Sequence, residues 1–428
     1  MKKILPFFAV SLISISIFSQ SYCSLAPRYD NDTMVFPNVT VTSNVPFGQN
    51  TNVGGSMQVL KMDIYEPTGD VATKRPLIVL AHGGSFIGGA KTDADQVLLC
   101  RHFAQCGYVA ATIDYRLGMG FPINGHAGRL AVIRAGQDMK AALRYFRRTI
   151  DSVNIYRLDS ANFFAGGVSA GAIAAVNMVY CDLASEIPPD VDTNVVGGME
   201  GNSGNPGFSS KVKALINICG AVGDTAWIHP GDVPLVSAQG GADITVPYCT
   251  DMTYLNPPTG FPMTVLHGTA SIHARALNIG LENPFHTFYN QGHTSPASNP
   301  QNADTTITLV SKFLYGQLGC TPMNTVDFTN TPRACAVYGT GVNEIVLSAE
   351  NVNVFPNPSQ SDVLLTLKNV KGNKFSAVLT DVLGRETGKF SFTQKDLVVK
   401  RNGMQPGIYF LKMTSDANEL FVAKVIFE

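Results

Sequence analysis

The chain has 428 residues, a formal net charge of -1, 15% charged residues and 45% hydrophobic residues. This length suits two domains, and the apolar content suits a well-filled core. Because the charge is balanced and no basic stripe is present, the composition argues against a nucleic-acid partner.

The N-terminus has the features of a secretory signal peptide. Two lysines precede an apolar run over residues 4–18, and small polar residues follow it. This run is too short and wrongly flanked for a membrane anchor, so we expect residues 1–23 to be a leader, with cleavage after Ser21 or Cys23. No later run approaches the roughly 18 apolar residues of a membrane-spanning helix.

A glycine-rich turn follows the first predicted core strand. Residues 76–81 form a continuous apolar run, typical of a strand in a covered parallel sheet. The next residues, His82–Gly89, let the backbone approach a ligand and direct N–H groups at a developing oxyanion. We expect the amides of Gly84, Ser85 and Ala170 to form an oxyanion hole. A simple strand-ending turn is the alternative.

Another strand is predicted at residues 108–113. Apolar residues then keep helical spacing over residues 131–150, which predicts a crossover helix. Its arginines Arg144, Arg147 and Arg148 lie near the C-terminal end of this helix, where the dipole favours cations. We expect them to form a solvated face without a binding role.

The candidate nucleophile is Ser169, in the sequence Gly167-Val168-Ser169-Ala170-Gly171. This is the G-x-S-x-G pattern, and it lies between a predicted strand at residues 162–165 and a helical run at residues 172–176. The sharp turn excludes bulky flanking side chains and projects the hydroxyl from the edge of the sheet. In a chain with 40 glycines, a chance turn is the alternative.

With these motifs the chain resembles the α/β-hydrolase superfamily, and within it the HGG-type carboxylesterases that include bacterial feruloyl and acetyl-xylan esterases. The resemblance implies an α/β fold with a mostly parallel sheet flanked by helices. It also implies that an acid and then a histidine follow the serine in the chain. The residues that carry it are Met62–Pro67, His82–Gly84, Asp114–Leu117 and Gly167–Gly171.

Asp243 is the candidate acid. It follows a predicted strand at residues 234–238, in a segment that resembles the family's HG-x-x-D-x-x-VP pattern, with Gln239 in place of the usual histidine. A carboxylate in this position would orient the base and stabilise its charged form. Asp224 and Asp232 are the competing candidates.

His293 is the candidate base, because it follows a predicted last strand at residues 286–289 in a Gly-His context. His267 is its main rival. The remaining histidines show no metal-ligand spacing, so we expect neither a catalytic metal nor a cofactor.

The glycine-rich stretch 197–210 is either a lid over the acyl pocket or an inert surface loop. Its large apolar residues are Met199 and Phe208. Because each buried CH₂ contributes about 0.8 kcal/mol, a lid of this composition predicts short-acyl or compact aryl esters rather than long-chain lipids.

The 8 cysteines of an exported chain are candidates for disulfides. We expect Cys320 to pair with Cys335, since the two bracket the end of the catalytic region. Cys219, on an apolar strand, is expected to be a buried free thiol. The remaining cysteines cannot be assigned.

From residue 350 onward, short alternating strands predict a small antiparallel all-β sandwich. This tail resembles the C-terminal sorting domain of the type IX secretion system of Bacteroidota. The resemblance implies the type IX secretion machinery as a partner, and a secreted or cell-surface location. A carbohydrate-binding sandwich is the alternative, disfavoured because the 1 tryptophan, Trp227, lies outside the tail. The resemblance is carried by Val354–Pro358, Asp381–Arg385 and Gly407–Leu411, with Lys424–Ile426 at the end.

The sequence therefore predicts a leader at 1–23, an α/β-hydrolase domain at 24–318, a turn-rich linker at 319–349 and a sorting domain at 350–428. The expected function is a secreted serine carboxylesterase that forms an acyl-enzyme on small-molecule or polysaccharide-linked esters. A prolyl-oligopeptidase-like peptidase is the enzymatic alternative, although no propeller-length region precedes residue 60. A surface binding protein on an inactive hydrolase scaffold is the other alternative.

Overall fold

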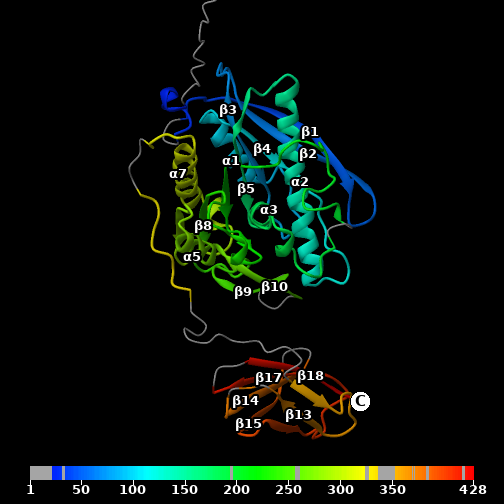
Figure 1. Cartoon of the computed structure of the whole chain (residues 1–428). Coiled ribbons are helices and arrows are strands. Elements are labelled where there is room, and N and C mark those ends of the chain that lie inside the picture. The colour runs from blue at the N-terminus through cyan, green and yellow to red at the C-terminus, as the bar shows by residue number, and fades with distance from the viewer. Residues whose placement is uncertain are drawn as a thin grey trace, which may run out of the picture. The chain divides into compact units, whose positions relative to one another are not determined.

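In the computed structural model the chain divides into two compact units, Met1–Cys335 and Ala336–Glu428, which are described separately (Figure 1). The expected leader lies almost entirely outside the described residues, as does most of the expected linker. The structure describes residues 22–30, 34–192, 196–255, 261–322, 327–335, 352–368, 370, 372–381, 385–416 and 420–428.

The N-terminal unit is built on an 8-stranded sheet in the order β1-β2-β4-β3-β5-β6-β8-β11. Strand β2 pairs antiparallel with β1 and β4, and all the other neighbours pair parallel. The mostly parallel sheet confirms the predicted fold class. The strands are β1 (Val39–Thr51), β2 (Met57–Pro67), β3 (Arg75–Ala81), β4 (Val109–Ile113), β5 (Leu158–Val168), β6 (Ala214–Ile218), β8 (Leu235–Gly240) and β11 (Phe285–Phe288).

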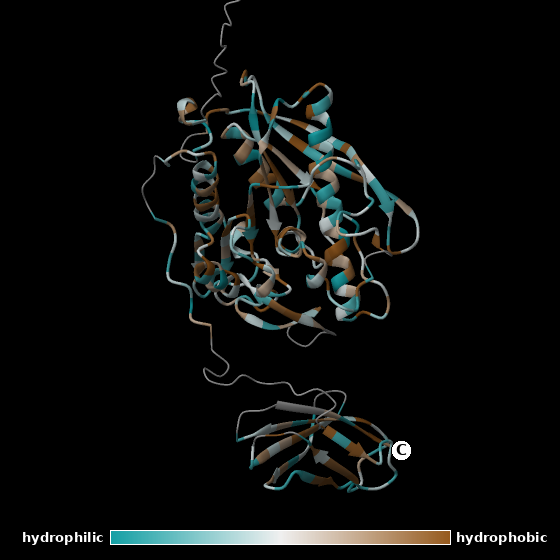
Figure 2. Cartoon of the chain, viewed as in Figure 1, coloured by the Kyte–Doolittle hydropathy of each residue, from teal (hydrophilic) through white to brown (hydrophobic). Residues whose placement is uncertain are grey.

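Helices cover both faces of this sheet. On β3, Leu77 and Val79 pack into one core with α2 and α3, whereas Ile78 and Leu80 pack into a second core with α1 and α7. Successive side chains of a strand point to opposite faces, so a strand covered on both sides is a continuous apolar run. Figure 2 shows hydrophobic and hydrophilic residues mixed along α2, and the buried apolar residues of this helix pack into the first core. The helices are α1 (Ala94–Gln105), α2 (Gly125–Ser152), α3 (Ala170–Tyr180), α5 (Thr269–Ile279), α6 (Ser295–Ser298) and α7 (Pro300–Gln317).

The N-terminal unit also contains a smaller antiparallel sheet, whose strands come before and after β8 in the sequence. Its order is β7-β10-β9, with β7 at Ala221–Val222, β9 at Thr250–Leu255 and β10 at Phe261–Gly268. Strands β9 and β10 form a hairpin inserted between β8 and α5. Within the described residues, no helix is long and apolar enough to span a membrane.

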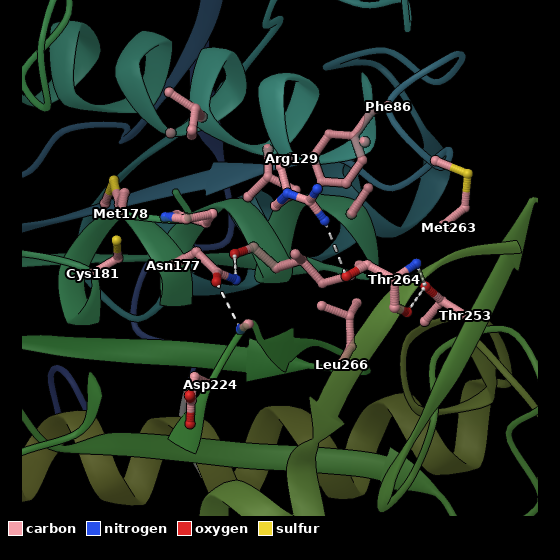
Figure 3. Close-up of a pocket in the computed structure, with 18 of the residues that line it drawn as sticks. Phe86, Arg129, Asn177, Met178, Cys181, Asp224, Thr253, Met263, Thr264 and Leu266 are labelled. Carbon is pink, nitrogen blue, oxygen red and sulfur yellow. Dashed lines mark hydrogen bonds between the residues drawn. The ribbon is translucent and has the colours of Figure 1, made fainter. Parts of the chain in front are cut away.

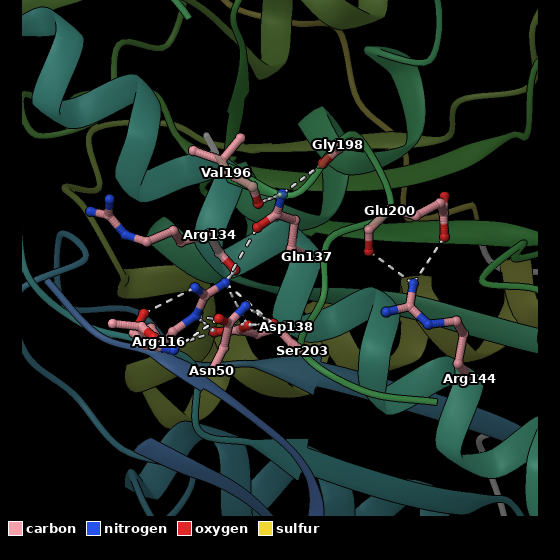
Figure 4. Close-up of polar contacts among 11 residues, drawn as sticks. Asn50, Arg116, Arg134, Gln137, Asp138, Arg144, Val196, Gly198, Glu200 and Ser203 are labelled. Carbon is pink, nitrogen blue, oxygen red and sulfur yellow. Dashed lines mark hydrogen bonds and ion pairs between the residues drawn. The ribbon is translucent and has the colours of Figure 1, made fainter. Parts of the chain in front are cut away.

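The stretch 197–210 is fixed to α2 and β1 by buried polar contacts (Figure 4). Ser203 is fully buried, its hydroxyl donates to Asp138, and its carbonyl accepts from the amide of Gln49. Asp138 in turn forms a buried ion pair with Arg116, with 2.9 Å between Nη2 and Oδ1. Loops that carry buried polar groups need such partners.

Glu200 anchors the same stretch to α2. Its carboxylate lies 2.9 Å from both Lys140 Nζ and Arg144 Nη1, and the Arg144 side chain is 3% exposed. The expectation that Arg144 belongs to a solvated face is therefore wrong, because the stretch 197–210 covers this side chain.

The disulfide prediction is also wrong in its pairing. The structure joins Cys23 to Cys320 and Cys249 to Cys335, rather than Cys320 to Cys335. Cys23 belongs to the short helix η1 (Tyr22–Leu25), which the fold brings to the end of α7. The four other cysteines are free and buried, as expected for Cys219.

The bonded cysteines lie near both edges of the N-terminal unit. Cys23, the last residue of the expected leader, is bonded to Cys320. At the other edge, the Asn330 side chain accepts from the amide of Thr287 and donates to its carbonyl, on β11. Residues 327–335, expected in the linker, thus extend this unit to Cys335.

The C-terminal unit consists of two antiparallel sheets around one core, as predicted. Burial alternates along its strands, for example at Val363, Leu365 and Leu367, which is the pattern of a strand with one covered face. One sheet contains β12 (Val352–Phe355), β13 (Val363–Leu367) and β16 (Asp396–Val399); the other contains β14 (Phe375–Asp381), β15 (Glu386–Phe392), β17 (Gly407–Ser415) and β18 (Leu420–Phe427).

Candidate active site

Ser169 is the single residue between β5 and α3, and its backbone is held in an unusual conformation with φ 56° and ψ -121°. Strained backbone of this kind persists only where the surroundings enforce it. Here the end of β3 leaves no space for side chains on either side. A Cβ at Gly167 or Gly171 would lie 2.4 or 2.0 Å from the carbonyl oxygen of Ala81. The two glycines of the motif therefore allow the turn that presents the Ser169 hydroxyl.

The structure brings the three predicted catalytic side chains together. His293 Nε2 lies 2.7 Å from Ser169 Oγ, and His293 Nδ1 lies 2.7 Å from Asp243 Oδ2. The Asp243 carboxylate is fully buried and accepts hydrogen bonds from the amides of Thr245 and Val246. This arrangement has the geometry in which a carboxylate orients a histidine toward a serine.

The competing candidates have other partners. His267 Nδ1 lies 2.8 Å from Thr250 Oγ1 on the neighbouring strand of the hairpin. Asp224 caps the short helix η3 (Thr225–Trp227) through the amide of Ala226. Asp232 accepts from the amide of His229, 2.7 Å away.

Gln239 takes a larger part than the sequence suggested. Its Nε2 donates to Asp243 Oδ2 at 3.1 Å and to the Val246 carbonyl, while its Oε1 accepts from the amide of Thr269. The residue that departs from the family pattern therefore contacts the acid directly. The signal for this role was its position four residues before Asp243.

The glycine-rich turn after β3 lies against the elbow. A Cβ at Gly83 would be 3.3 Å from Ser169 Cβ, and Ser85 lines the same cavity as Ser169 and Ala170. Gly84 has φ 106°, and its carbonyl accepts from the amides of Ile87 and Gly88, so it shapes the turn. Such a conformation favours glycine.

Tyr115 contacts this turn through both its hydroxyl and its ring. Its hydroxyl donates to the carbonyl oxygens of His82 and Gly83 at 3.0 and 3.3 Å, and its ring stacks on the His82 ring. Burial lowers the pKa of His82, which disfavours the charged imidazolium in the stack. Tyr115 lies in the Asp114–Leu117 motif, but no local sequence pattern indicates this contact.

Cys219 lies behind the acid and the base. Its Sγ and ligand atoms of Asp243 and His293 all lie within 4.8 Å of one another. Burial raises the pKa of the Cys219 thiol, and a neutral thiol is a weak metal ligand. Because His293 and Asp243 are already hydrogen bonded, we assign no metal to this cluster.

A cavity of about 720 Å³ opens at Ser169 (Figure 3). This volume lies in the range of sites that bind small molecules. Its walls come from the turn after β3, α2, α3, residues 185–190, the segment after β7 and the β9–β10 hairpin. Of the stretch 197–210, Met199 lines the cavity and Phe208 does not. The candidate lid therefore packs mainly against α2, whereas the β9–β10 hairpin lines the cavity.

Two family models match the chain. The BD-FAE model matches residues 62–223, and the secretion system C-terminal sorting domain matches residues 353–428. The chain joins a BD-FAE esterase-like domain to a type IX sorting domain. The sorting domain indicates export to the cell surface or into the medium, which confirms the predicted location.

Individual proteins resemble parts of this chain. Carboxylesterase 3B of Mus musculus is 34% identical over 125 residues, which are 28% of this chain and 21% of that protein. An endo-acting ulvan lyase of Formosa agariphila is 28% identical over 121 residues, 27% of this chain and 23% of that protein. The chain thus matches less than a quarter of the length of these relatives.

Among solved structures, the chain is similar to esterase 2 of Thermogutta terrifontis. The butyrate-bound form is 20% identical with a TM-score of 0.47, covering 67% of this chain and 97% of that one. The apo form is 20% identical with a TM-score of 0.46, covering 68% and 98%.

Proposed function

We propose that this protein is a serine carboxylic-ester hydrolase that acts through Ser169, His293 and Asp243. The observation that carries the proposal is the continuous hydrogen-bonded chain from the Ser169 hydroxyl through His293 to the buried Asp243 carboxylate. A serine hydroxyl becomes a strong nucleophile when a positioned base takes its proton. An inactive binding scaffold would not need these three groups aligned at a strained elbow.

In this mechanism Ser169 Oγ attacks the ester carbonyl carbon while His293 Nε2 accepts the hydroxyl proton. Asp243 stabilises the resulting imidazolium. The amides of Gly84, Ser85 and Ala170 hold the oxyanion. His293 then gives its proton to the leaving alkoxide, and the acyl group remains on Ser169. Water, deprotonated by His293, finally hydrolyses the acyl-enzyme and releases the acid.

The proposed substrates are short-acyl or aryl esters, free or attached to a polysaccharide. The cavity has room for an aryl acid. Met199 is the one residue of the stretch 197–210 that lines the cavity. The composition of this stretch therefore does not limit the length of the acyl group. Short-acyl esters are therefore the smallest of the proposed substrates, and longer acyl groups are not excluded.

The test combines active-site labelling with turnover. A fluorophosphonate should label the full chain at Ser169 and should not label Ser169→Ala. Ser169→Ala and His293→Ala should each lower kcat for p-nitrophenyl acetate by roughly four to six orders of magnitude, and the double variant by little more. Asp243→Asn should lower kcat less, because the serine and the base remain.

His267→Ala is the matched control, because His267 is the rival histidine and its partner is Thr250. Near-normal turnover by His293→Ala, together with loss in His267→Ala, would overturn the assignment of the base. Comparison of p-nitrophenyl acetate with dipeptide anilides separates the esterase from the peptidase alternative. Faster cleavage of the anilides would favour the peptidase.

The domain boundaries belong to the same proposal. We place the start of the folded enzyme at residue 22 and its end at Cys335, since both disulfides lie inside these limits. The type IX machinery would then recognise the unit from residue 352 onward.

A further inference from the structure

The cavity beside Ser169 is long. Its lining residues on α3 run from Ala170 at the start of the helix, through Ile173 and Met178, to Cys181 at its C-cap. At 1.5 Å per residue, the distance from Ser169 to Cys181 along the helix is roughly 18 Å. Figure 3 shows Met178 and Cys181 at one end of the view, with Phe86 and Met263 at the other.

The position of His293 indicates which half of the ester lies in this cavity. The described residues that line the cavity include Ser169, Ser85 and Ala170, and they do not include His293. The base must reach the leaving oxygen to protonate it. Departure of the alcohol on the His293 side would leave the cavity along α3 for the acyl group.

Several of the polar groups that border the cavity are already paired, although the buried Glu186 Oε1 has no hydrogen-bond partner. Arg129 Nε donates to Asp190 Oδ1, and its Nη1 donates to Thr264 Oγ1. The Asn177 amide donates to the carbonyls of Ile173 and Ala221 and accepts from the amide of Gly223. A polar acyl group would find these donors and acceptors occupied, and its desolvation would be uncompensated.

Apolar side chains form much of the remaining walls. They come from α2 and α3, from residues 185–190, from the segment after β7, and from the hairpin. The main side chains are Val132, Ile133, Ile173, Trp227, Met263 and Leu266.

We propose that this cavity binds an extended apolar acyl group, longer than butyryl, along α3. The inference rests on the proposed esterase function and specifies its acyl preference. The shared chemistry is an apolar chain attached to the ester carbonyl, either a straight alkanoyl chain or a phenylalkanoyl group. Each methylene that the cavity removes from water raises kcat/KM by at most roughly fourfold. Because these contacts are equal in the ground state and the transition state, the gain appears in KM.

The experiment measures kcat and KM of the full chain on p-nitrophenyl acetate, butyrate, octanoate, dodecanoate and 3-phenylpropanoate. We expect KM to fall from acetate to octanoate, with octanoate exceeding butyrate in kcat/KM by roughly tenfold or more. A higher value for octanoate than for 3-phenylpropanoate identifies the alkanoyl source, and the reverse identifies the phenylalkanoyl source.

Two variants test the position of the chain. Ile173→Phe fills the cavity one turn from Ser169 and should lower the octanoate-to-acetate ratio of kcat/KM by roughly tenfold. Cys181→Phe fills the far end and should lower the dodecanoate-to-octanoate ratio instead. Val179→Phe is the matched control, because Val179 lies on the same helix and does not line the cavity.

The results separate this inference from the proposed function. If acetate is hydrolysed but KM does not fall with chain length, the inference is overturned and the esterase stands. Equal ratios in Ile173→Phe and Val179→Phe would also overturn it. If neither acetate hydrolysis nor fluorophosphonate labelling occurs, the esterase function itself fails. Should Ile173→Phe not fold, the wild-type series and Cys181→Phe still decide the question.

Discussion

Replacement of Asp138 by asparagine should destabilise the N-terminal unit strongly without removing any catalytic group. The Asp138 carboxylate is fully buried and lies 2.9 Å from Arg116 Nη2, and the Arg116 side chain is 5% exposed. Asp138 also accepts from the Arg116 amide and the Ser203 hydroxyl. Asp138→Asn keeps the shape of the side chain but leaves the guanidinium buried without its counter-ion.

The magnitude follows from burial. Loss of one partner of a buried ion pair lowers the free energy of unfolding by about 3–5 kcal/mol, whereas an exposed pair contributes about 0–1 kcal/mol. The chain offers a matched exposed pair, since Arg129 and Asp190 form a two-contact ion pair with side-chain exposures of 30% and 38%. Asp190→Asn should therefore lower the free energy of unfolding by less than about 1 kcal/mol.

Urea unfolding followed by tryptophan fluorescence measures both variants in the full chain. The 1 tryptophan, Trp227, lies in the N-terminal unit, so the signal reports this unit and not the tail. A similar loss in Asp138→Asn and Asp190→Asn would refute the reasoning. So would a loss below about 1 kcal/mol for Asp138→Asn.

Three further predictions use other features. Cys23→Ser opens a cross-link with a sequence separation of 297 and should lower the free energy of unfolding by about 2–5 kcal/mol in non-reducing urea; an unchanged unfolding midpoint would count against the bond. Tyr115→Phe removes the hydrogen bonds to His82 and Gly83, so kcat should fall roughly tenfold with little change in KM, and steady-state kinetics that show the opposite split would contradict its positioning role. A chain that ends at Cys335 should hydrolyse p-nitrophenyl acetate at the full-length rate, because the two units have separate cores, yet fractionation of the native host should find it in the periplasm.

The parts of the site that the sequence predicted are those whose chemistry restricts the local backbone. Gly167 and Gly171 are required beside Ser169 because the end of β3 leaves no space there, so the motif and the fold imply each other. The acid and base followed from their positions after predicted strands. In a parallel sheet such residues meet at the carboxyl edge, whatever their distance in the chain.

The features that the sequence did not predict depend on contacts between distant segments. The buried Ser203 hydroxyl is hydrogen bonded to Asp138, and the buried Arg144 is paired with Glu200. In each pair one residue belongs to α2 and the other to the stretch 197–210. No local pattern distinguishes a glycine-rich lid from a glycine-rich segment held under a helix. The pairing of Cys23 with Cys320 likewise depends on where η1 meets α7, which only the folded chain defines.

The bond between Cys23 and Cys320 closes most of the N-terminal unit into one covalent ring. A protease that cuts a surface loop once inside this ring opens it without releasing a fragment, and the severed ends remain packed in one sheet. The 249–335 bond encloses a second, overlapping ring. For a protein exported from the cell, a single cut inside this ring leaves all of its residues covalently joined. A piece of these rings can leave only after two cuts within the same segment, that is, both within 23–249, both within 249–320 or both within 320–335.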